Sequence, residues 1–434
     1  MGYKYSNYTK KVSINSQTYL YNTFSDVLIA IDKELNSFID NNECSIDEIK
    51  LRHSTFFNAL LQARFIIDEQ SVEWEDVINA WKEEDTTPTK YTIIINPTLN
   101  CNMKCWYCYE KHDTNTNMTQ AVIHSIQNLI STKVTENDLK GLSIDFFGGE
   151  PLLNYKKAVL PILEHAYTEC LNNNKNLYAS FTTNGYLLSD EIYNQLLKYT
   201  KWGDIRLQIT LDGNRSFHDK TRALGGLNGT FDKIVDNIKR FAKGKFHIHI
   251  RCNYTQENIY SFYDVIEEFA DLPYNDKQNM SFSLHKVWQA TASQKLREEA
   301  ILLCHAIKKA GLNCDSLCLS PHRCYAEKEN TAIINYNGNT YKCTARDFNE
   351  HNKEGVLLEC GKIEWNSNYA KRMAIKYGND ECHQCFLFPL CHADCSQHKI
   401  EDNRKTCIKE YSEEQKEILM RERVEFLLEQ TTVS

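Results

Sequence analysis

The sequence predicts an α/β fold in which parallel strands alternate with helices. Between residues 91 and 284, short runs rich in β-branched residues alternate with longer stretches that carry apolar residues at helical spacing. The predicted strands are 91–96, 142–147, 177–182, 205–211, 246–251 and 280–284, and the predicted helices lie near 119–132, 155–171, 189–199, 230–242 and 257–269. Six strand and helix units in this order are typical of a parallel sheet with crossover helices.

The segments on either side of this repeat predict smaller units. Before it, the sequence predicts a hairpin of residues 12–14 and 19–21 around Asn15 and Ser16, helices in 24–38 and 46–67, and an acidic linker at 81–88. After it, a helical stretch at 293–310 leads into a cysteine-rich region. The last predicted helix, 412–429, has an apolar stripe that we expect to pack on that region.

Composition excludes several classes of protein. The 434 residues are 42% apolar, but no apolar run approaches the 18 or so residues that span a bilayer, and the first residues have no apolar signal core. The net charge is −8 and no basic block stands out, so neither a membrane nor nucleic acid is an expected partner. We expect a cytoplasmic protein, in which 17 cysteines indicate metal binding rather than disulfides.

Three cysteines lie on one short loop after the first predicted strand, which Asn96 and Pro97 end. Cys101, Cys105 and Cys108 are separated by three and then by two residues. Cysteine thiolates are the usual protein ligands of iron–sulfur clusters, and a cubane has four irons, so three cysteines leave one iron open. An open metal position is where a substrate or cofactor can bind. The alternatives are a zinc site that lacks its fourth ligand and a chance cluster.

This loop resembles the CxxxCxxC loop of the radical SAM enzymes. The resemblance implies that Cys101, Cys105 and Cys108 hold a [4Fe-4S] cluster that binds S-adenosylmethionine (SAM) at its free iron and cleaves it reductively to a 5′-deoxyadenosyl radical. It also implies that the six units form a partial (β/α)6 TIM barrel. The site of such a barrel lies at the C-terminal ends of the strands.

The same resemblance implies residues that bind SAM. A Gly-Gly-Glu sequence at 148–150 follows the second strand, and this motif contacts the methionyl amino group in the family. Thr210 and Arg222 keep the spacing of a hydroxyl and an arginine that contact SAM in anaerobic sulfatase-maturing enzymes, and an Arg fork suits the methionyl carboxylate. The expected cofactor-binding residues are Tyr107, Gly148, Gly149, Glu150, Asn184, Thr210 and Arg222.

The second cysteine-rich region resembles the SPASM domain, because its seven-cysteine pattern matches in every gap. The resemblance implies two auxiliary [4Fe-4S] clusters with interleaved ligands. Cluster I would take Cys318, Cys324, Cys343 and Cys395, and cluster II would take Cys382, Cys385, Cys391 and Cys407. Cys314 is close enough in sequence to replace Cys318, and a structural zinc ribbon is the alternative to the whole assignment.

These resemblances imply a radical SAM/SPASM maturase that installs a crosslink or related oxidative modification in a ribosomally made precursor peptide. The expected units are a winged-helix-like module that binds the leader peptide (1–88), the barrel (89–290), a linker helix (291–312), the SPASM domain (313–410) and a C-terminal helix (411–434). The expected electron donor is a flavodoxin or ferredoxin. Expected partners are therefore proteins and a peptide.

Two alternative functions remain. One is an anaerobic sulfatase-maturing enzyme, a branch that carries an Asp after the cysteine that corresponds to Cys343. This chain has Thr344 there, and its nearest acid is Asp347, which with Tyr107 and Glu150 is a candidate for an unassigned base. The other alternative is a metal-containing, peptide-binding scaffold without catalysis, for which damaged cofactor motifs would be expected.

Overall fold

The computed structural model describes residues 2–33, 35–36, 45–224, 229–319, 322–377, 380–392, 395–401, 407 and 409–432. The chain divides into two compact units. Unit 1 takes residues 1–86, 318–328 and 370–434, and unit 2 takes 87–317 and 329–369. The residues of the expected N-terminal module therefore share a unit with most of the second cysteine-rich region.

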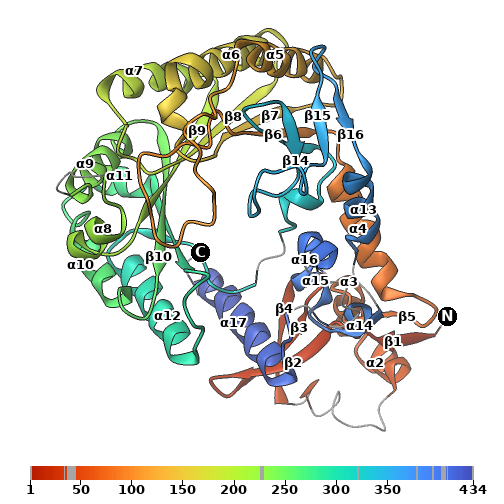
Figure 1. Ribbon diagram of the computed structural model, residues 1–434. Helices are drawn as coiled ribbons and strands as arrows, with labels where there is room; N and C mark the ends of the chain where they lie inside the picture. Colours follow the sequence, from red (N-terminus) through yellow and green to blue (C-terminus); the bar gives the residue numbers. More distant parts are fainter. Residues whose placement is uncertain are drawn as a thin grey trace. The chain divides into compact units, whose positions relative to one another are not determined.

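The six predicted strands are confirmed with nearly the same bounds. They are β6 (Lys90–Ile95), β7 (Gly141–Phe146), β8 (Asn176–Thr183), β9 (Gly203–Leu211), β10 (Phe246–Tyr254) and β11 (Met280–Lys286). Each is parallel to the next in chain order. Figure 1 shows that this sheet is curved, with helices along its outer side. The C-terminal ends of six neighbouring strands consequently meet at one edge.

Short strands extend this sheet at both sides, and the sequence did not predict them. β12 (Asn313–Cys314) pairs with β11, and β13 (Thr331–Ile334) runs parallel to β6. β14 (Asn339–Tyr341), β15 (Gly355–Leu357) and β16 (Ile363–Trp365) follow as antiparallel neighbours. The described residues thus form an 11-stranded sheet in unit 2.

The predicted helices of unit 2 are also confirmed. They are α5 (Gln120–Val134), α6 (Leu160–Asn172) with the π-turn η2 (Tyr155–Val159) before it, α7 (Asp190–Tyr199), α9 (Phe231–Ala242), η3 (Ile259–Ser261) with α10 (Phe262–Glu267), and α12 (Gln294–Lys309). η1 (Pro151–Asn154), α8 (Arg215–Thr221) and α11 (Tyr274–Gln278) are short additions. Thr119, Ser189 and Ser293 accept hydrogen bonds from the first turns of α5, α7 and α12, as N-cap residues do.

The two faces of the curved sheet differ in chemistry. Alternate strand residues such as Ile93, Ile144 and Leu207 are fully buried in the core beneath the helices. The residues between them point to the other face, where Asp145 and Arg251 are examples, and these residues line two cavities. Parallel strands are usually apolar on both faces. A polar inner face therefore marks the interior of the sheet as a place for ligands.

Unit 1 contains two small sheets and several helices. β1 (Tyr3–Tyr5) pairs with β5 (Ile66–Asp68), and β2 (Thr9–Ile14), β3 (Gln17–Asn22) and β4 (Val27–Ile31) form an antiparallel meander. Its helices are α2 (Ile46–Arg52), α3 (Ser54–Gln62), α4 (Glu73–Thr86), η4 (Tyr325–Glu327), α14 (Asp380–Gln384), α15 (Phe388–Cys391), α16 (Ser396–Glu401) and α17 (Glu413–Thr432), and α13 (Ser367–Ile375) begins in unit 2. The predicted hairpin is confirmed, since Asn15 and Ser16 have positive φ, as a two-residue type I′ turn requires.

Two predictions for unit 1 are wrong. Residues 27–31 of the supposed helix 24–38 form strand β4, because a short apolar run fits either structure and pairing with β3 decides. Phe38 and Cys44 lie outside the described residues. The supposed acidic linker at 81–88 is helical up to Thr86, and the Asp85 carboxylate is fully buried between Arg323 and Lys376 at 2.9 and 3.0 Å.

Within the described ranges, no helix combines the length and the apolar character needed to cross a membrane.

Candidate active site

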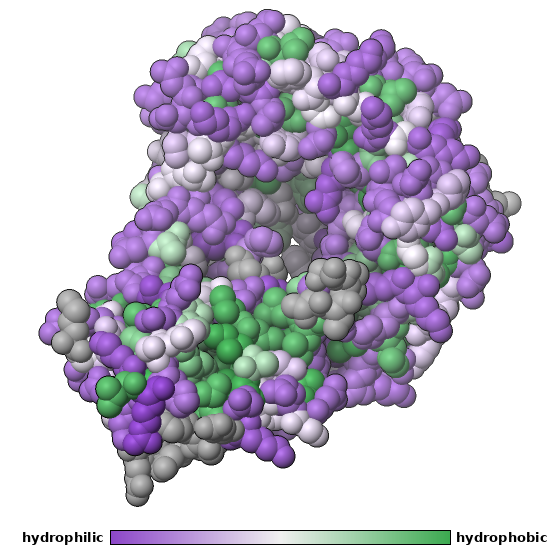
Figure 2. All heavy atoms as spheres, turned by 180° about the vertical axis from the view of Figure 1, so that it is seen from behind, coloured by the Kyte–Doolittle hydropathy of each residue, from purple (hydrophilic) through white to green (hydrophobic). Residues whose placement is uncertain are grey.

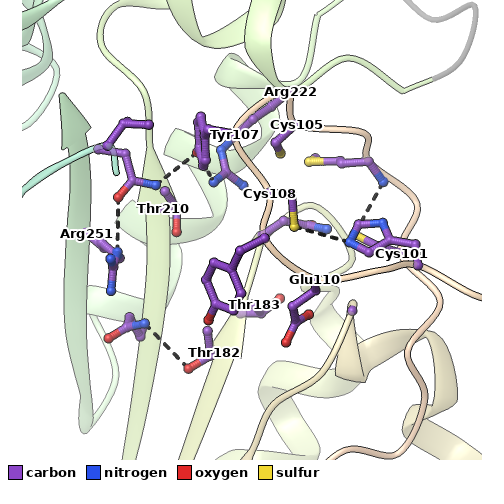
Figure 3. A pocket seen from close by; sticks show the side chains of 18 of the residues that line it. Cys101, Cys105, Tyr107, Cys108, Glu110, Thr182, Thr183, Thr210, Arg222 and Arg251 are labelled. Atoms are coloured by element: carbon purple, nitrogen blue, oxygen red, sulfur yellow. Dashed lines mark hydrogen bonds between the residues drawn. The ribbon is translucent and has the colours of Figure 1, made fainter. Parts of the chain in front are cut away.

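The three thiols of the first cysteine loop face a pocket at the C-terminal ends of the strands of unit 2 (Figure 3). Cys101 and Cys105 are half-buried against the core, and Cys108 is exposed. Burial raises the pKa of Cys101 to about 12, so without a metal this thiol is neutral. A metal reverses this, because coordination deprotonates the thiol. Three sulfurs presented to one pocket are a donor set that fits an iron–sulfur cluster with one open iron.

The pocket collects most of the predicted SAM contacts. Its lining comprises residues that follow β7 (Gly148, Gly149), end or follow β8 (Thr182, Thr183, Asn184), lie on β9 (Gln208, Thr210) and β10 (Arg251, Asn253), and follow α8 (Arg222), together with Tyr107 of the cysteine loop. Six different segments thus contribute polar groups to one volume. Ligand sites of parallel α/β sheets lie at this edge.

Gly148 and Gly149 hold the cysteine loop against the end of β7. Gly148 has φ of +103°, and a Cβ atom there would lie 2.4 Å from the Thr98 carbonyl oxygen. On Gly149 it would lie 2.3 Å from the Asn100 carbonyl oxygen. The backbone N–H groups of Gly149 and Glu150 donate to these same two carbonyls, at 3.2 and 2.8 Å. Only glycine permits this approach.

Glu150 does not line the pocket, although its two glycine neighbours do. Its carboxylate is fully buried and accepts hydrogen bonds from the N–H groups of Asn184 (2.8 Å) and Leu152 (3.0 Å) and from Thr183 Oγ1 (2.8 Å). Burial raises the pKa of Glu150 to about 7, against the effect of these hydrogen bonds. Glu150 therefore ties the end of β7 to the end of β8, and its contact with SAM stays a prediction.

Tyr107 is the centre of a hydrogen-bond network that connects the cysteine loop to β9 and β10. Its hydroxyl donates to Asp212 Oδ1 (2.7 Å) and accepts from Arg222 Nη2 (2.7 Å) and Asn253 Nδ2 (2.9 Å). Arg222 Nε also donates to the Asp212 carboxylate, in an ion pair whose side chains are 8% and 2% exposed. Burial raises the pKa of Tyr107, so the phenol stays protonated. The network fixes the direction of the Arg222 guanidinium.

Sequence reasoning did not assign Arg251 and Glu110, which also line the pocket. Arg251 donates from Nε to Asn253 Oδ1 (3.0 Å) and forms no ion pair with any described residue. Oε1 of Glu110 is buried without a hydrogen-bond partner among the described residues, and burial raises the pKa of Glu110 to about 8. The alternation of polar and apolar residues along 247–253 could have identified Arg251. Nothing in the sequence distinguishes Glu110 from a surface acid.

Aromatic side chains flank the cysteine loop. Trp106 and Trp288 are 60% and 59% exposed, and Trp288 stacks on Tyr109 with ring centroids 5.0 Å apart. Tyr109 and Trp288 line the pocket. Exposed, stacked rings of this kind are typical of sites that bind another chain.

In unit 1, four cysteines of the second region surround one small cavity. Cys382, Cys385, Cys391 and Cys407 line it together with Leu387, Phe388 and Lys416. These are the four residues expected to hold auxiliary cluster II, and a set of four thiols around one space fits a fully protein-coordinated cluster.

The residues expected for auxiliary cluster I lie in both units. Cys318, Cys324 and Cys395 belong to unit 1, and Cys343 to unit 2. Cys314, the alternative to Cys318, interacts with Cys304, and a hydrogen bond between the two thiols raises the pKa of Cys314. Asp347, a candidate base, forms an ion pair with Lys111 at 2.6 Å. The ligand set of this cluster stays a prediction.

Comparisons with known proteins match the part of the chain that contains this pocket. The sequence model of the Radical SAM superfamily matches residues 95–272. A cysteine-type anaerobic sulfatase-maturating enzyme of Clostridium novyi is 26% identical over 352 residues, which cover 71% of this chain and 88% of that protein. The radical SAM cyclopropyl synthase TigE of Paramaledivibacter caminithermalis is 30% identical over 258 residues, which cover 55% of this chain and 46% of that protein.

Solved structures share the fold. Native anSMEcpe with bound AdoMet superposes with a TM-score of 0.59 at 18% identity, over 79% of this chain and all of that one. SuiB of Streptococcus suis bound to S-adenosylmethionine gives a TM-score of 0.51 at 15% identity, over 93% of this chain and 98% of that one. The matched family model shows that the chain has a radical SAM domain, and with relatives that are maturating and modifying enzymes the chain is an enzyme.

Proposed function

We propose that the chain modifies a ribosomally made precursor peptide, installing a crosslink or a related oxidative modification. The observation that carries this proposal is the loop of Cys101, Cys105 and Cys108, which presents three sulfurs to a polar pocket beside exposed aromatic rings. Two relatives named above modify proteins or make a cyclopropyl group, and SuiB has been solved with its precursor peptide SuiA. The structures of anSMEcpe with the Cp18Cys peptide and of SuiB with SuiA support a peptide as the substrate class, and the exposed aromatic rings beside the pocket suit one.

In this proposal Cys101, Cys105 and Cys108 would hold a [4Fe-4S] cluster, which would supply the electron for the reductive cleavage of SAM. The protein's part is to orient and to exclude water. Gly148, Gly149, Asn184, Thr210 and Tyr107, which line the pocket, would surround the cofactor, and Arg222 would offer its guanidinium to the methionyl carboxylate. Since Asp212 and Tyr107 already fix Arg222, little side-chain entropy is lost when it binds.

The N-terminal sheet is proposed to bind the leader of the precursor peptide. Within the described residues, β4 is an edge strand of its sheet. All of its residues are apolar, and all except the buried Ile31 are half-buried or exposed. An extended peptide can add to such an edge as a further strand. Figure 2 shows a face of the molecule on which apolar residues gather in the lower part of the view. An external flavodoxin or ferredoxin would supply the electrons.

Metal analysis after anaerobic reconstitution tests this proposal. We expect about twelve irons per chain, as three cubanes require, and formation of 5′-deoxyadenosine from SAM and dithionite. Zinc in place of iron would contradict it. A short open reading frame beside the gene supplies the peptide probe, and co-expression followed by mass spectrometry shows whether that peptide loses hydrogen.

The second candidate function is sulfatase maturation, favoured by the relative that aligns over most of its length. Against it, Thr344 stands where that branch carries its acid, and Asp347 is paired with Lys111. A synthetic sulfatase peptide that contains the target cysteine distinguishes the two. Its conversion to formylglycine would establish this second function.

A further inference from the structure

Among the described residues, two arginines line the pocket of unit 2, and they differ in their partners. Arg222 forms a buried ion pair with Asp212 and also donates to the Tyr107 hydroxyl. Arg251 of β10 donates from Nε to Asn253 Oδ1 at 3.0 Å, and no described residue forms an ion pair with it. The pocket thus contains one guanidinium that is balanced by a carboxylate and one that is not.

The Arg251 side chain is half-buried, and part of its hydrogen-bonding capacity is unused. Burial lowers the pKa of Arg251, because water solvates the charge less well there than at the surface. Removing a charge from water costs free energy unless an opposite charge meets it. The edge of the guanidinium with Nη1 and Nη2 makes no hydrogen bond to a described residue, and such an edge matches the two oxygens of a carboxylate.

The two arginines lie apart in the pocket (Figure 3). Arg222 is near the thiols: burial raises the pKa of Cys101, Cys105 and Cys108, and the positive charge of Arg222 opposes this rise at each of them. Arg251 lies across the view from Cys101. SAM contains one carboxylate, which is proposed to bind Arg222. A carboxylate for Arg251 therefore comes from another molecule.

Two further charged side chains of the lining leave Arg251 unbalanced. Glu110 lies apart from Arg251 in Figure 3, and its buried Oε1 has no hydrogen-bond partner among the described residues. Lys286 adds a second positive charge, and its Nζ donates to the backbone carbonyls of Val287 at 3.2 Å and Ala290 at 2.5 Å. The side of the pocket around Arg251 therefore favours a negatively charged group.

We propose that Arg251 is a specificity-determining residue, which binds a carboxylate of the precursor peptide close to the carbon that is modified. This inference rests on the proposed function, in which a peptide enters the pocket. The carboxylate belongs to an Asp or Glu side chain or to the C-terminus of the peptide. Tyr109 and Trp288 line the same pocket, so a peptide that packs on their rings can reach Arg251. A bidentate pair then fixes the direction of the peptide relative to the cofactor.

The test uses the full-length, reconstituted protein and synthetic copies of the precursor peptide encoded beside the gene. Each Asp and Glu of the peptide is replaced in turn by Asn or Gln, and a further copy has a C-terminal amide. Mass spectrometry measures kcat/KM for modification. Removing one of these carboxylates should lower kcat/KM about tenfold or more. The same removal should have little further effect in Arg251→Gln, because the partner of the carboxylate is already missing.

Two further variants and a matched control sharpen the test. Arg251→Lys keeps the charge without the fork and should retain part of the preference for the carboxylate. Arg251→Glu should modify the peptide in which a Lys replaces the recognised acid better than it modifies the original peptide. Arg206→Gln is the control, because Arg206 lies on the neighbouring strand β9 but lines the other cavity of the sheet. It should keep the preference of the unsubstituted protein.

The inference is overturned if the unsubstituted protein modifies every carboxylate-free copy, the amide included, as fast as the original peptide. It is also overturned if removal of a carboxylate lowers kcat/KM by the same factor in Arg251→Gln as in the unsubstituted protein. A higher KM for SAM in Arg251→Gln with the same peptide preference would assign Arg251 to the cofactor instead. Failure of the proposed function looks different, because the unsubstituted protein would then leave all the peptides unmodified.

Discussion

The two cysteine regions differ in what surrounds their sulfur atoms. The first presents three cysteines from one loop to a pocket lined by polar strand ends, with Arg251 and Glu110 among the lining residues. The second gathers four cysteines from separate segments around a small cavity that also contains Leu387 and Phe388. Three sulfurs beside polar groups suit a site that binds a further molecule, and four sulfurs beside apolar groups suit a closed cluster. The number of cysteines and the side chains beside them together separate the two roles.

Removing one sulfur from the first region gives the largest expected effect. Cys105→Ala should abolish 5′-deoxyadenosine formation from SAM and dithionite and lower the iron content from about twelve to about eight per chain. Chromatography of the nucleoside and iron analysis check this. Cys360→Ala, at an exposed cysteine outside both sets, is the control and should change neither value. Undiminished nucleoside formation in Cys105→Ala would mean that the catalytic loop lies elsewhere.

Removing one sulfur from the second region should also lower the iron content but should spare SAM cleavage. Cys385→Ala should also remove about four irons, but SAM cleavage without peptide should continue, because the first loop is intact. The melting temperature of unit 1 should fall, since a cluster held by distant segments contributes to folding. Calorimetry and the nucleoside assay measure the two effects. Equal loss of SAM cleavage in Cys385→Ala and Cys105→Ala would erase the distinction between the regions.

Disrupting the hydrogen-bond network of Tyr107, Asp212 and Arg222 should lower both the stability of the protein and its affinity for the cofactor. Asp212→Asn leaves the buried Arg222 without a counter-charge, which costs about 3–5 kcal/mol. Urea unfolding of the iron-free protein measures this, and the KM for SAM should rise because Arg222 loses its fixed direction. Asp232→Asn breaks a solvent-exposed pair with Arg215 and should cost far less, because water and salt screen the two charges. If the two variants lose the same free energy of unfolding, the buried pair contributes no more to stability than the exposed pair.

Acidification should lower the stability of unit 2, and each of three histidines should contribute less than the Asp212→Asn substitution does. Burial lowers the pKa of His218 and His249 to about 3 and that of His285 to about 4. The unfolded chain, with histidine pKa near 6.5, therefore binds more protons, and stability is full above about pH 6.5 and falls toward pH 4. Each histidine should contribute about 1 kcal/mol of loss at pH 5.5.

Urea unfolding of the iron-free protein at pH 7.5 and 5.5 checks the sign. His249→Gln can still bond with Ser281 and Ser283, and it should unfold with a weaker dependence on pH than the unsubstituted protein. A stability that rises on acidification would contradict the neutral, buried state of these side chains.

The sequence predicted the parts of this molecule that depend on local pattern. The six parallel strands follow from short runs of β-branched residues that alternate with helical stretches, and the loop of Cys101 to Cys108 follows from the spacing of its cysteines. Local pattern predicted the wrong structure where residues outside the segment determine it. Val27–Ile31 forms a strand because it pairs with β3. Asp85 is buried because Arg323 and Lys376 form ion pairs with its carboxylate. Glu150 keeps its place in the motif, yet its carboxylate accepts hydrogen bonds from Thr183 and Asn184 and is not among the residues that line the pocket.

The close approach of Gly148 and Gly149 to the carbonyls of Thr98 and Asn100 has a practical consequence. The cysteine loop is fastened to the sheet by these peptide groups and by the Tyr107 hydroxyl. Because a side chain at either glycine would meet a carbonyl oxygen of the loop, the position of the three sulfurs depends on two residues that contribute no atom beyond the backbone.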